Sequence, residues 1–354
     1  MRQLQSARRV RESRMAAETQ RLQSSRTQSK PTTAHNHIQP QVNPSIQDES
    51  KKRNVDIDEV VVNIEEPKSK NPGKVKIAIC ICGYVPRSFK QTLPSITKNI
   101  INPLEDEYDI DLYCYSLLSK SNTIDSSIVD ENTMAIDNNS VYLIKTKNTT
   151  TKYQEDISDE ISQIIKKNNI KLRELNIVNF VRQLYMEQNS FEVIKNSGID
   201  YKAIVYLQPD MFICKQISKS EIEKSIKHKK YIYTCSFNDW NGYGFGYYIG
   251  SPEAINIVTS QIDNLYTLTN VQPEKLLKTT IDKNKLERRK SDMFHFKVRA
   301  NSKPNVYYQL LKKYLSSTDY QWVLKNFNNP NLVFSKYNHK SKKPQKNKRR
   351  SCPI

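Results

Sequence analysis

The chain has 354 residues, of which 37% are hydrophobic, and it carries a formal net charge of +19. This length predicts one large domain with tails, or two domains. No segment has the roughly 18–20 apolar residues of a membrane-spanning helix, and no Cys-x-x-Cys pair indicates a zinc or redox site. These absences favour a soluble, cytoplasmic protein with reduced thiols.

Both ends of the chain are polar and basic. Residues 1–73 are rich in Gln, Ser, Thr and Arg, and residues 336–354 contain eight basic residues and no acidic one. Segments of this composition bury too little apolar surface to offset the entropy lost on ordering. We therefore predict a disordered basic tail and linker over 1–73, an α/β domain over 74–335 and a disordered basic tail over 336–354. Such tails attract polyanions.

Apolar runs and amphipathic segments alternate through the middle of the chain. Continuous β-branched runs predict buried strands, and apolar residues with a helical period predict helices. In chain order, strands are expected at 75–82, 108–116, 140–145, 203–207, 231–237, 247–250 and 293–299, and helices at 87–99, 156–167, 176–196, 221–228, 252–266 and 273–282. This alternation predicts an α/β fold with a doubly wound, mainly parallel sheet flanked by helices.

Polar segments follow three of the predicted strands. Ligands of open α/β sheets bind beyond the carboxyl ends of the strands, so each segment is a candidate site. In the first, Gly83 would let a ligand approach the backbone, and Arg87 near a helix start would hold a phosphate. The alternative is an ordinary turn between a strand and a helix.

The second segment is Gln208-Pro209-Asp210, directly after the strand at 203–207. A carboxylate at this place is positioned to hold a divalent cation that bridges diphosphate oxygens. The alternative is that Asp210 only caps the turn after Pro209.

The third segment, 238–246, contains three of the chain's seven glycines together with several aromatic residues. Aromatic faces suit sugar rings, which makes Trp240 and Tyr243, with the neighbouring Asn238, candidate contacts to the sugar or acceptor. Asp239 is the only acid in the segment, and it is the candidate general base. A flexible surface loop is the alternative.

Five segments, taken in order, form a wider pattern. They are Asn179-Phe180-Val181-Arg182-Gln183-Leu184-Tyr185, the run AIVYLQPDMF at 203–212, Asn238-Asp239, Ile249-Gly250-Ser251-Pro252-Glu253-Ala254 and Pro273-Glu274-Lys275-Leu276-Leu277. This pattern resembles a family of glycosyltransferase-like proteins found in large DNA viruses of amoebae and in plants. Members carry a strand ending in Arg-Pro-Asp, a short Asn-Asp segment and Gly-Ser-Pro-Glu. The resemblance covers 74–299.

The resemblance implies a GT-A-type fold and a glycosyltransferase that moves a sugar from a nucleotide-diphospho-sugar to an acceptor. With the strand-end segments it assigns Asp239 as catalytic, Gly83, Arg87, Arg182 and Asp210 to the donor, and Asn238, Trp240, Tyr243 and Glu274 to the sugar or acceptor. A divalent cation, Mn²⁺ or Mg²⁺, would be held by Asp210.

One position departs from the pattern. GT-A enzymes use Asp-x-Asp for the metal, and Gln208 stands at the first of these positions. A neutral amide binds a hard cation less well than a carboxylate does. A basic side chain such as Arg182 is therefore an alternative partner for the diphosphate.

Two other functions stay open. The domain can be a catalytically inactive binding or structural module, including a virion-associated one, which donor hydrolysis assays would reveal. The chain can also be a nucleic-acid-associated protein that acts through its tails, in which case DNA binding would be salt-sensitive and lost on tail removal. A viral source would place the protein in the host cytoplasm or the virion.

Overall fold

The computed structural model describes residues 73–121, 123, 134–170, 175–237, 239, 241–267, 272–302, 304–305 and 308–326. All of them belong to the unit formed by residues 65–354. The predicted tails at 1–73 and 336–354 lie outside the described residues, apart from Gly73. Among the described helices, none combines the length and the apolar character needed to cross a bilayer.

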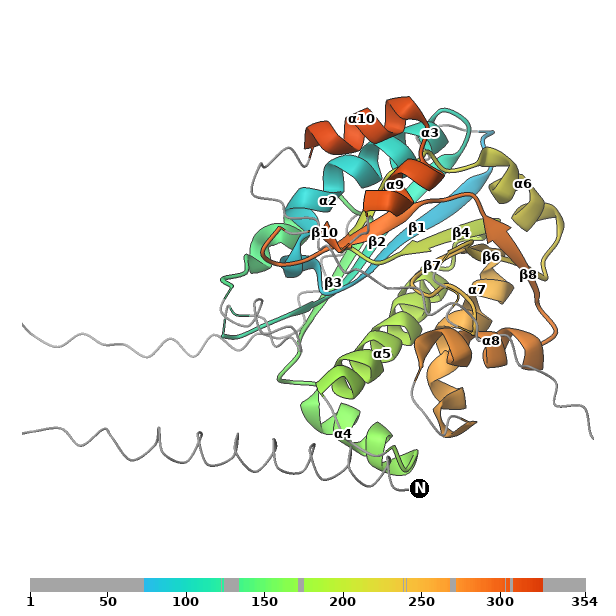
Figure 1. Cartoon of the computed structure of the whole chain (residues 1–354). Coiled ribbons are helices and arrows are strands. Elements are labelled where there is room, and N and C mark those ends of the chain that lie inside the picture. The colour runs from blue at the N-terminus through green and yellow to red at the C-terminus, as the bar shows by residue number, and fades with distance from the viewer. Residues whose placement is uncertain are drawn as a thin grey trace, which may run out of the picture. The chain divides into compact units, whose positions relative to one another are not determined.

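A seven-stranded sheet lies at the centre of this unit, in the order β3-β2-β1-β4-β7-β6-β8 (Figure 1). Its strands are β1 Lys76–Gly83, β2 Asp109–Leu118, β3 Asn148–Tyr153, β4 Ala203–Leu207, β6 Tyr231–Cys235, β7 Tyr247–Gly250 and β8 Glu287–Ser291. Only β7 runs antiparallel to its two neighbours, β4 and β6. The expected α/β fold with a mainly parallel sheet is confirmed.

The sheet is buried on both faces because successive side chains of a strand point to opposite sides. In β1, Ile77 and Ile79 belong to one apolar cluster, whereas Ala78 and Cys80 belong to the other. Five cysteines lie buried as free thiols among the described residues, namely Cys80, Cys82, Cys114, Cys214 and Cys235. They act as small apolar side chains.

Helices cover both faces of the sheet (Figure 1). One face carries α2 Phe89–Ile96, α3 Asn102–Glu105 and α6 Lys219–Lys227, and the other carries α5 Leu175–Asn196, α7 Pro252–Thr259 and α8 Pro273–Lys283, with α4 Ser158–Lys167 packed on α5. Short helices of other types fill the connections, at η1 Val85–Arg87, η2 Thr97–Ile101, η4 Asn138–Tyr142 and η5 Ser260–Thr267. The apolar stripe of each major helix faces the sheet, which fixes the helices in place.

A second, antiparallel sheet begins just beyond the carboxyl end of β4. It consists of β5 Met211–Ile213, β9 His295–Val298 and β10 Pro304–Asn305 in the order β10-β9-β5. Phe212 and Phe296 face each other across it with ring centres 5.1 Å apart, and Trp322 stacks on Phe212 at 5.2 Å. Trp322 belongs to α10 Ser317–Asn326, which follows α9 Tyr308–Tyr314. The aromatic stack anchors the second sheet.

The strand predicted at 140–145 is wrong. Residues Asn138–Tyr142 form a 3₁₀ helix that Asp137 caps by accepting a hydrogen bond from the Asn139 N–H at 2.9 Å. The strand is instead β3, Asn148–Tyr153, a polar segment at the edge of the sheet that pairs only with β2. Capping chemistry outweighed a short apolar run, and the threonines of β3 favour a strand without an apolar pattern.

Candidate functional site

The carboxyl ends of β1 and β4 are packed directly against each other. Gly83 ends β1 with φ +150°, and a Cβ added there would lie 2.7 Å from the Pro209 Cδ and 3.4 Å from the Gln183 Oε1. Only glycine permits this approach. The close neighbour of Gly83 is thus the turn after β4, and its predicted contact with a ligand stays a prediction.

Asp210 lies in this turn as a buried carboxylate surrounded by positive charge. Its Oδ2 is 3.5 Å from the Arg87 Nη1 and 3.7 Å from the Lys297 Nζ. Burial alone would raise the pKa of Asp210, but Lys297, Arg87 and Arg299 together hold it below its ordinary value. The predicted pair of Arg87 and Asp210 is therefore brought together, with two further cations beside it.

Lys297 reaches this turn from the second sheet. In the β5–β9 register it stands opposite Met211, the residue after Asp210, and its Nζ donates a hydrogen bond to the Gln208 Oε1 at 2.6 Å. Burial lowers the pKa of Lys297, and the charge of Asp210 acts in the opposite direction. One ammonium group therefore contacts both polar residues of the Gln208-Pro209-Asp210 segment.

A divalent cation does not fit these side chains. Mn²⁺ and Mg²⁺ require several free oxygen ligands, whereas Lys297 already contacts both the Gln208 amide oxygen and the Asp210 carboxylate. Within the part of the chain that the structure describes, no three His, Cys, Asp or Glu side chains are grouped to hold a metal. We assign no metal-dependent step to this site.

Arg182 lies near the same strand end. Its Nη1 donates to the Asn179 Oδ1 at 3.1 Å on α5. Burial raises the pKa of Tyr84, the residue after β1, and the charges of Arg87 and Arg182 act against that shift. Both arginines are therefore close to the end of β1, as a donor site would require.

Residues 241–246 are packed into the domain and meet the turn after β4. The Gln208 N–H donates to the Gly246 carbonyl oxygen at 3.2 Å. A Cβ at Gly242 would overlap the Glu274 carbonyl group, and one at Gly244 would overlap the Cys235 Sγ. Gly242 and Gly244 therefore serve close packing.

Asp239 holds the segment to the edge of the main sheet. Its Oδ1 accepts hydrogen bonds from the Arg288 Nη2 at 2.7 Å and from the Gly244 N–H at 3.0 Å. Its Oδ2 accepts none from a described residue. The two predicted segments converge as expected, but the Asp210 carboxylate faces β9 and the Asp239 carboxylate faces β8.

Tyr243 is part of the packing rather than a free aromatic face. Its N–H donates to the Glu274 carbonyl oxygen at 2.9 Å, and its hydroxyl donates to the Asp282 Oδ1 at 3.2 Å. The Arg288 guanidinium and the Lys278 ammonium each lie 4.9 Å from its ring centre. Cations so placed occupy the surface that a sugar would need.

Glu274 is the second residue of α8, and its carboxylate accepts a hydrogen bond from its own backbone N–H. No side chain of a described residue forms a hydrogen bond or ion pair with it. Burial raises its pKa, and the charge of Lys297 lowers it in part, which places the carboxylate near the Lys297 cluster. Two further predicted contacts, Asn238 and Trp240, lie outside the described residues.

Three residues of this cluster are absent from the sequence prediction. His295, Lys297 and Arg299 alternate along the strand predicted at 293–299, and all three act electrostatically on Asp210. His295 is buried, and burial together with the charge of Lys297 lowers its pKa to about 3, so it is neutral. The alternation of basic residues on a single strand face was the available signal.

A buried carboxyl group lies beneath the site on α5. The Glu187 Oε1 accepts from the Gln183 Nε2 at 3.1 Å, and its Oε2 accepts from the Gln261 Nε2 at 2.9 Å. Burial raises the pKa of Glu187 to about 8. The Gln183 Oε1 also lies close to Gly83. The buried Gln183, Glu187 and Gln261 side chains therefore pack behind the end of β1.

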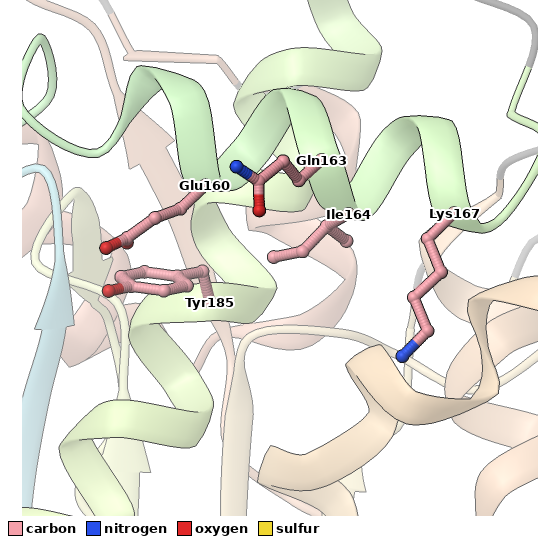
Figure 2. A pocket seen from close by; sticks show the side chains of 5 residues that line it. All are labelled: Glu160, Gln163, Ile164, Lys167 and Tyr185. Atoms are coloured by element: carbon pink, nitrogen blue, oxygen red, sulfur yellow. The ribbon is translucent and has the colours of Figure 1, made fainter.

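A separate hollow lies between α4 and α5 (Figure 2). Glu160, Gln163, Ile164 and Lys167 of α4 line it together with Tyr185 of α5. Burial and the neighbouring Glu160 carboxylate raise the pKa of Tyr185 to about 12. None of these five is a predicted site residue, and we place no function in the hollow.

Comparison with known proteins gives distant structural likenesses. No family model and no curated protein matches the chain. Among solved structures, mouse xyloside xylosyltransferase 1 in its apo form has a TM-score of 0.35 and 8% sequence identity, covering 61% of this chain and 84% of that one. A transferase mutant has a TM-score of 0.26 and 11% identity, covering 69% of this chain and 91% of that one. Likenesses this distant leave the function to be inferred from the site residues.

Proposed function

We propose that this chain is a glycosyltransferase that moves a sugar from a nucleotide-diphospho-sugar to an acceptor. The observation that carries the proposal is the surplus of positive charge around Asp210, where Arg87, Lys297 and Arg299 surround one carboxylate. This surplus favours a polyanionic ligand, and a diphosphate supplies the missing negative charge. The carboxyl ends of strands are also where open α/β sheets bind ligands.

The fold agrees with this assignment. A mainly parallel sheet covered on both faces, with a small second sheet beside the strand ends, is compatible with the GT-A type that the sequence resemblance implies. In this arrangement the donor diphosphate lies over Arg87 and Lys297. The sugar then extends towards the 239–246 segment and the start of α8.

Two carboxylates are candidates for the general base that activates the acceptor hydroxyl. Asp239 is the residue predicted from the sequence, and its Oδ2 is available. Glu274 forms no hydrogen bond or ion pair with the side chain of another described residue, and burial raises its pKa, as is common for carboxylates that act as bases. We favour Glu274 as the base, with Asp239 ordering the loop.

The test is consumption of a donor by the full-length protein. The common nucleotide sugars are each incubated with the protein, and release of the nucleoside diphosphate is measured with and without manganese. We expect at least one donor to be consumed, and consumption to fall in Arg87→Met. The control is Lys290→Met, which removes an exposed charge on β8.

Two outcomes contradict the proposal in different ways. Binding of a nucleoside diphosphate without consumption of any nucleotide sugar would leave only an inactive binding module. If the protein neither binds a nucleoside diphosphate nor consumes a donor, the donor site itself is rejected.

A further inference from the structure

Lys297 contacts both polar side chains of the Gln208-Pro209-Asp210 segment. Its Nζ is 2.6 Å from the Gln208 Oε1 and 3.7 Å from the Asp210 Oδ2, the two side chains at the positions of the Asp-x-Asp motif. A cation is therefore already built into the site from the chain itself. We propose that the Lys297 ammonium replaces the divalent cation, so that the donor diphosphate binds without metal. This inference rests on the proposed function.

The backbone fixes Lys297 in this place. The Val298 N–H donates to the Asp210 carbonyl oxygen at 2.8 Å, and the Cys214 N–H donates to the Phe294 carbonyl oxygen at 2.9 Å. These bonds hold β9 against the 210–214 segment on both sides of Lys297. Because hydrogen bonds fix the strand register on both sides of Lys297, the ammonium cannot shift along β9 without breaking the small sheet.

Gln208 suits an ammonium better than it suits a metal. Its amide oxygen accepts a hydrogen bond from Lys297 without adding negative charge. A carboxylate at this position would pair Lys297 with two acids and halve the surplus of positive charge around Asp210. Gly246 keeps the amide in place, because a Cβ there would lie 2.7 Å from the Gln208 Oε1. The replacement of the first Asp of Asp-x-Asp by Gln208 therefore suits the presence of Lys297.

Lys297 also remains able to meet a ligand. An ammonium has three N–H donors; one is used for Gln208 and a second is directed at Asp210, which leaves one for a ligand. The side chain is 36% exposed, so solvent and ligand reach it. Arg87 contacts the same carboxylate oxygen, Asp210 Oδ2. It can therefore share a bound diphosphate with Lys297.

The experiment is a calorimetric titration of uridine diphosphate and guanosine diphosphate into the full-length protein, once in EDTA and once in manganese chloride. We expect at least one of them to bind with the same Kd in both conditions, within about twofold. Lys297→Met should weaken binding about tenfold or more, because it removes the charge and keeps the length. Lys297→Arg should retain most of the affinity, and the control Lys290→Met should match the wild type.

A double variant tests the replacement itself. Gln208→Asp combined with Lys297→Ala restores two carboxylates and removes the ammonium, so its binding should become about tenfold tighter in manganese than in EDTA. Thermal melting of each variant verifies that it is folded. Wild-type binding that requires manganese, or unchanged affinity in Lys297→Met, would overturn the inference and leave the proposed function standing. Absence of binding in both conditions would overturn both.

Discussion

The Asp239 carboxylate accepts a hydrogen bond from the Arg288 Nη2 at 2.7 Å, and this pair ties the end of β6 to the edge strand β8. Arg288 is well anchored, since its Nε donates to the Thr234 Oγ1 at 2.9 Å and its Nη2 also donates to the Cys235 carbonyl oxygen at 2.9 Å. Its side chain is only 9% exposed. Asp239 therefore has a structural task whether or not it takes part in chemistry.

Asp239→Asn separates these two roles. The amide still accepts from Gly244 and Arg288, so the free energy of unfolding should fall by only about 1 kcal/mol. If Asp239 is the base, turnover should fall about 10²–10⁴-fold with little change in nucleotide binding. Urea unfolding and turnover are measured on the same preparation. Unchanged turnover would remove Asp239 from the chemistry and leave it as the residue that orders the loop.

Glu274→Gln is the matched test of the carboxylate that we favour. It should lower turnover about 10²–10⁴-fold, because the variant cannot accept a proton, while the nucleotide Kd stays the same. Glu253→Gln is the control, since Glu253 also follows a proline in the first turn of a helix and lies on the exposed surface. Equal turnover in the two variants would exclude Glu274 as the base.

Gly246→Ala should disturb the site more than a similar change elsewhere. Gly246 has φ +91° and its added Cβ would press on Gln208, whereas Gly198 has φ +68° with open space around it. Gly198→Ala should therefore cost about 1 kcal/mol of backbone strain, and Gly246→Ala more than about 2 kcal/mol through strain and overpacking. Urea unfolding of both variants measures the difference. Equal costs would mean that the contact between Gly246 and Gln208 is absent.

Glu187 predicts an unusual dependence of stability on pH. Its pKa is raised to about 8 from an ordinary value of 4.5. Between these two pH values the folded protein therefore holds a proton that the unfolded chain has released. The contribution of Glu187 to stability is therefore full below pH 4.5 and is lost as the pH rises to about 8. The groups that act on it are Gln183, Gln261 and Lys297. The Glu187 charge in turn raises the pKa of its buried neighbours Cys80, Cys82, Tyr206 and Tyr248.

Glu187→Gln isolates this contribution because the amide does not titrate. Relative to the wild type, the variant should gain stability as the pH rises from 4.5 to 8, by at most about 5 kcal/mol. Urea unfolding of both proteins across this range measures the gain, and other titrating groups cancel in the difference. Stability curves that run parallel over the whole range would show that Glu187 is not held protonated.

Much of the fold can be predicted from the sequence because local apolar patterns indicate most of its strands and helices. The predicted bounds of the strand at 203–207 and of the long helix at 176–196 agree with the observed bounds to within one residue. The edge strand β8, Glu287–Ser291, has no such pattern. Its charged side chains protect an exposed edge instead of filling a core, so hydrophobic periodicity does not reveal it.

The candidate site is predicted only where its residues follow parallel strands. Arg87 and Asp210 were found because strand ends meet at one edge of an α/β sheet. Lys297 comes from a different sheet, and its position depends on the register of β9 with β5, which the sequence does not reveal. The same holds for the partner of Asp239, because Arg288 lies on the unpredicted strand β8.

The most direct test of the account is whether a nucleoside diphosphate stabilises the protein through the cluster around Asp210. Thermal unfolding is followed in EDTA with uridine or guanosine diphosphate, for the wild type, Arg87→Met and Lys290→Met. We predict that one nucleotide, at about 100 times its Kd, stabilises the wild type and Lys290→Met by about 2.7 kcal/mol, and Arg87→Met by clearly less. No stabilisation of the wild type, or equal stabilisation of Arg87→Met, would contradict the account.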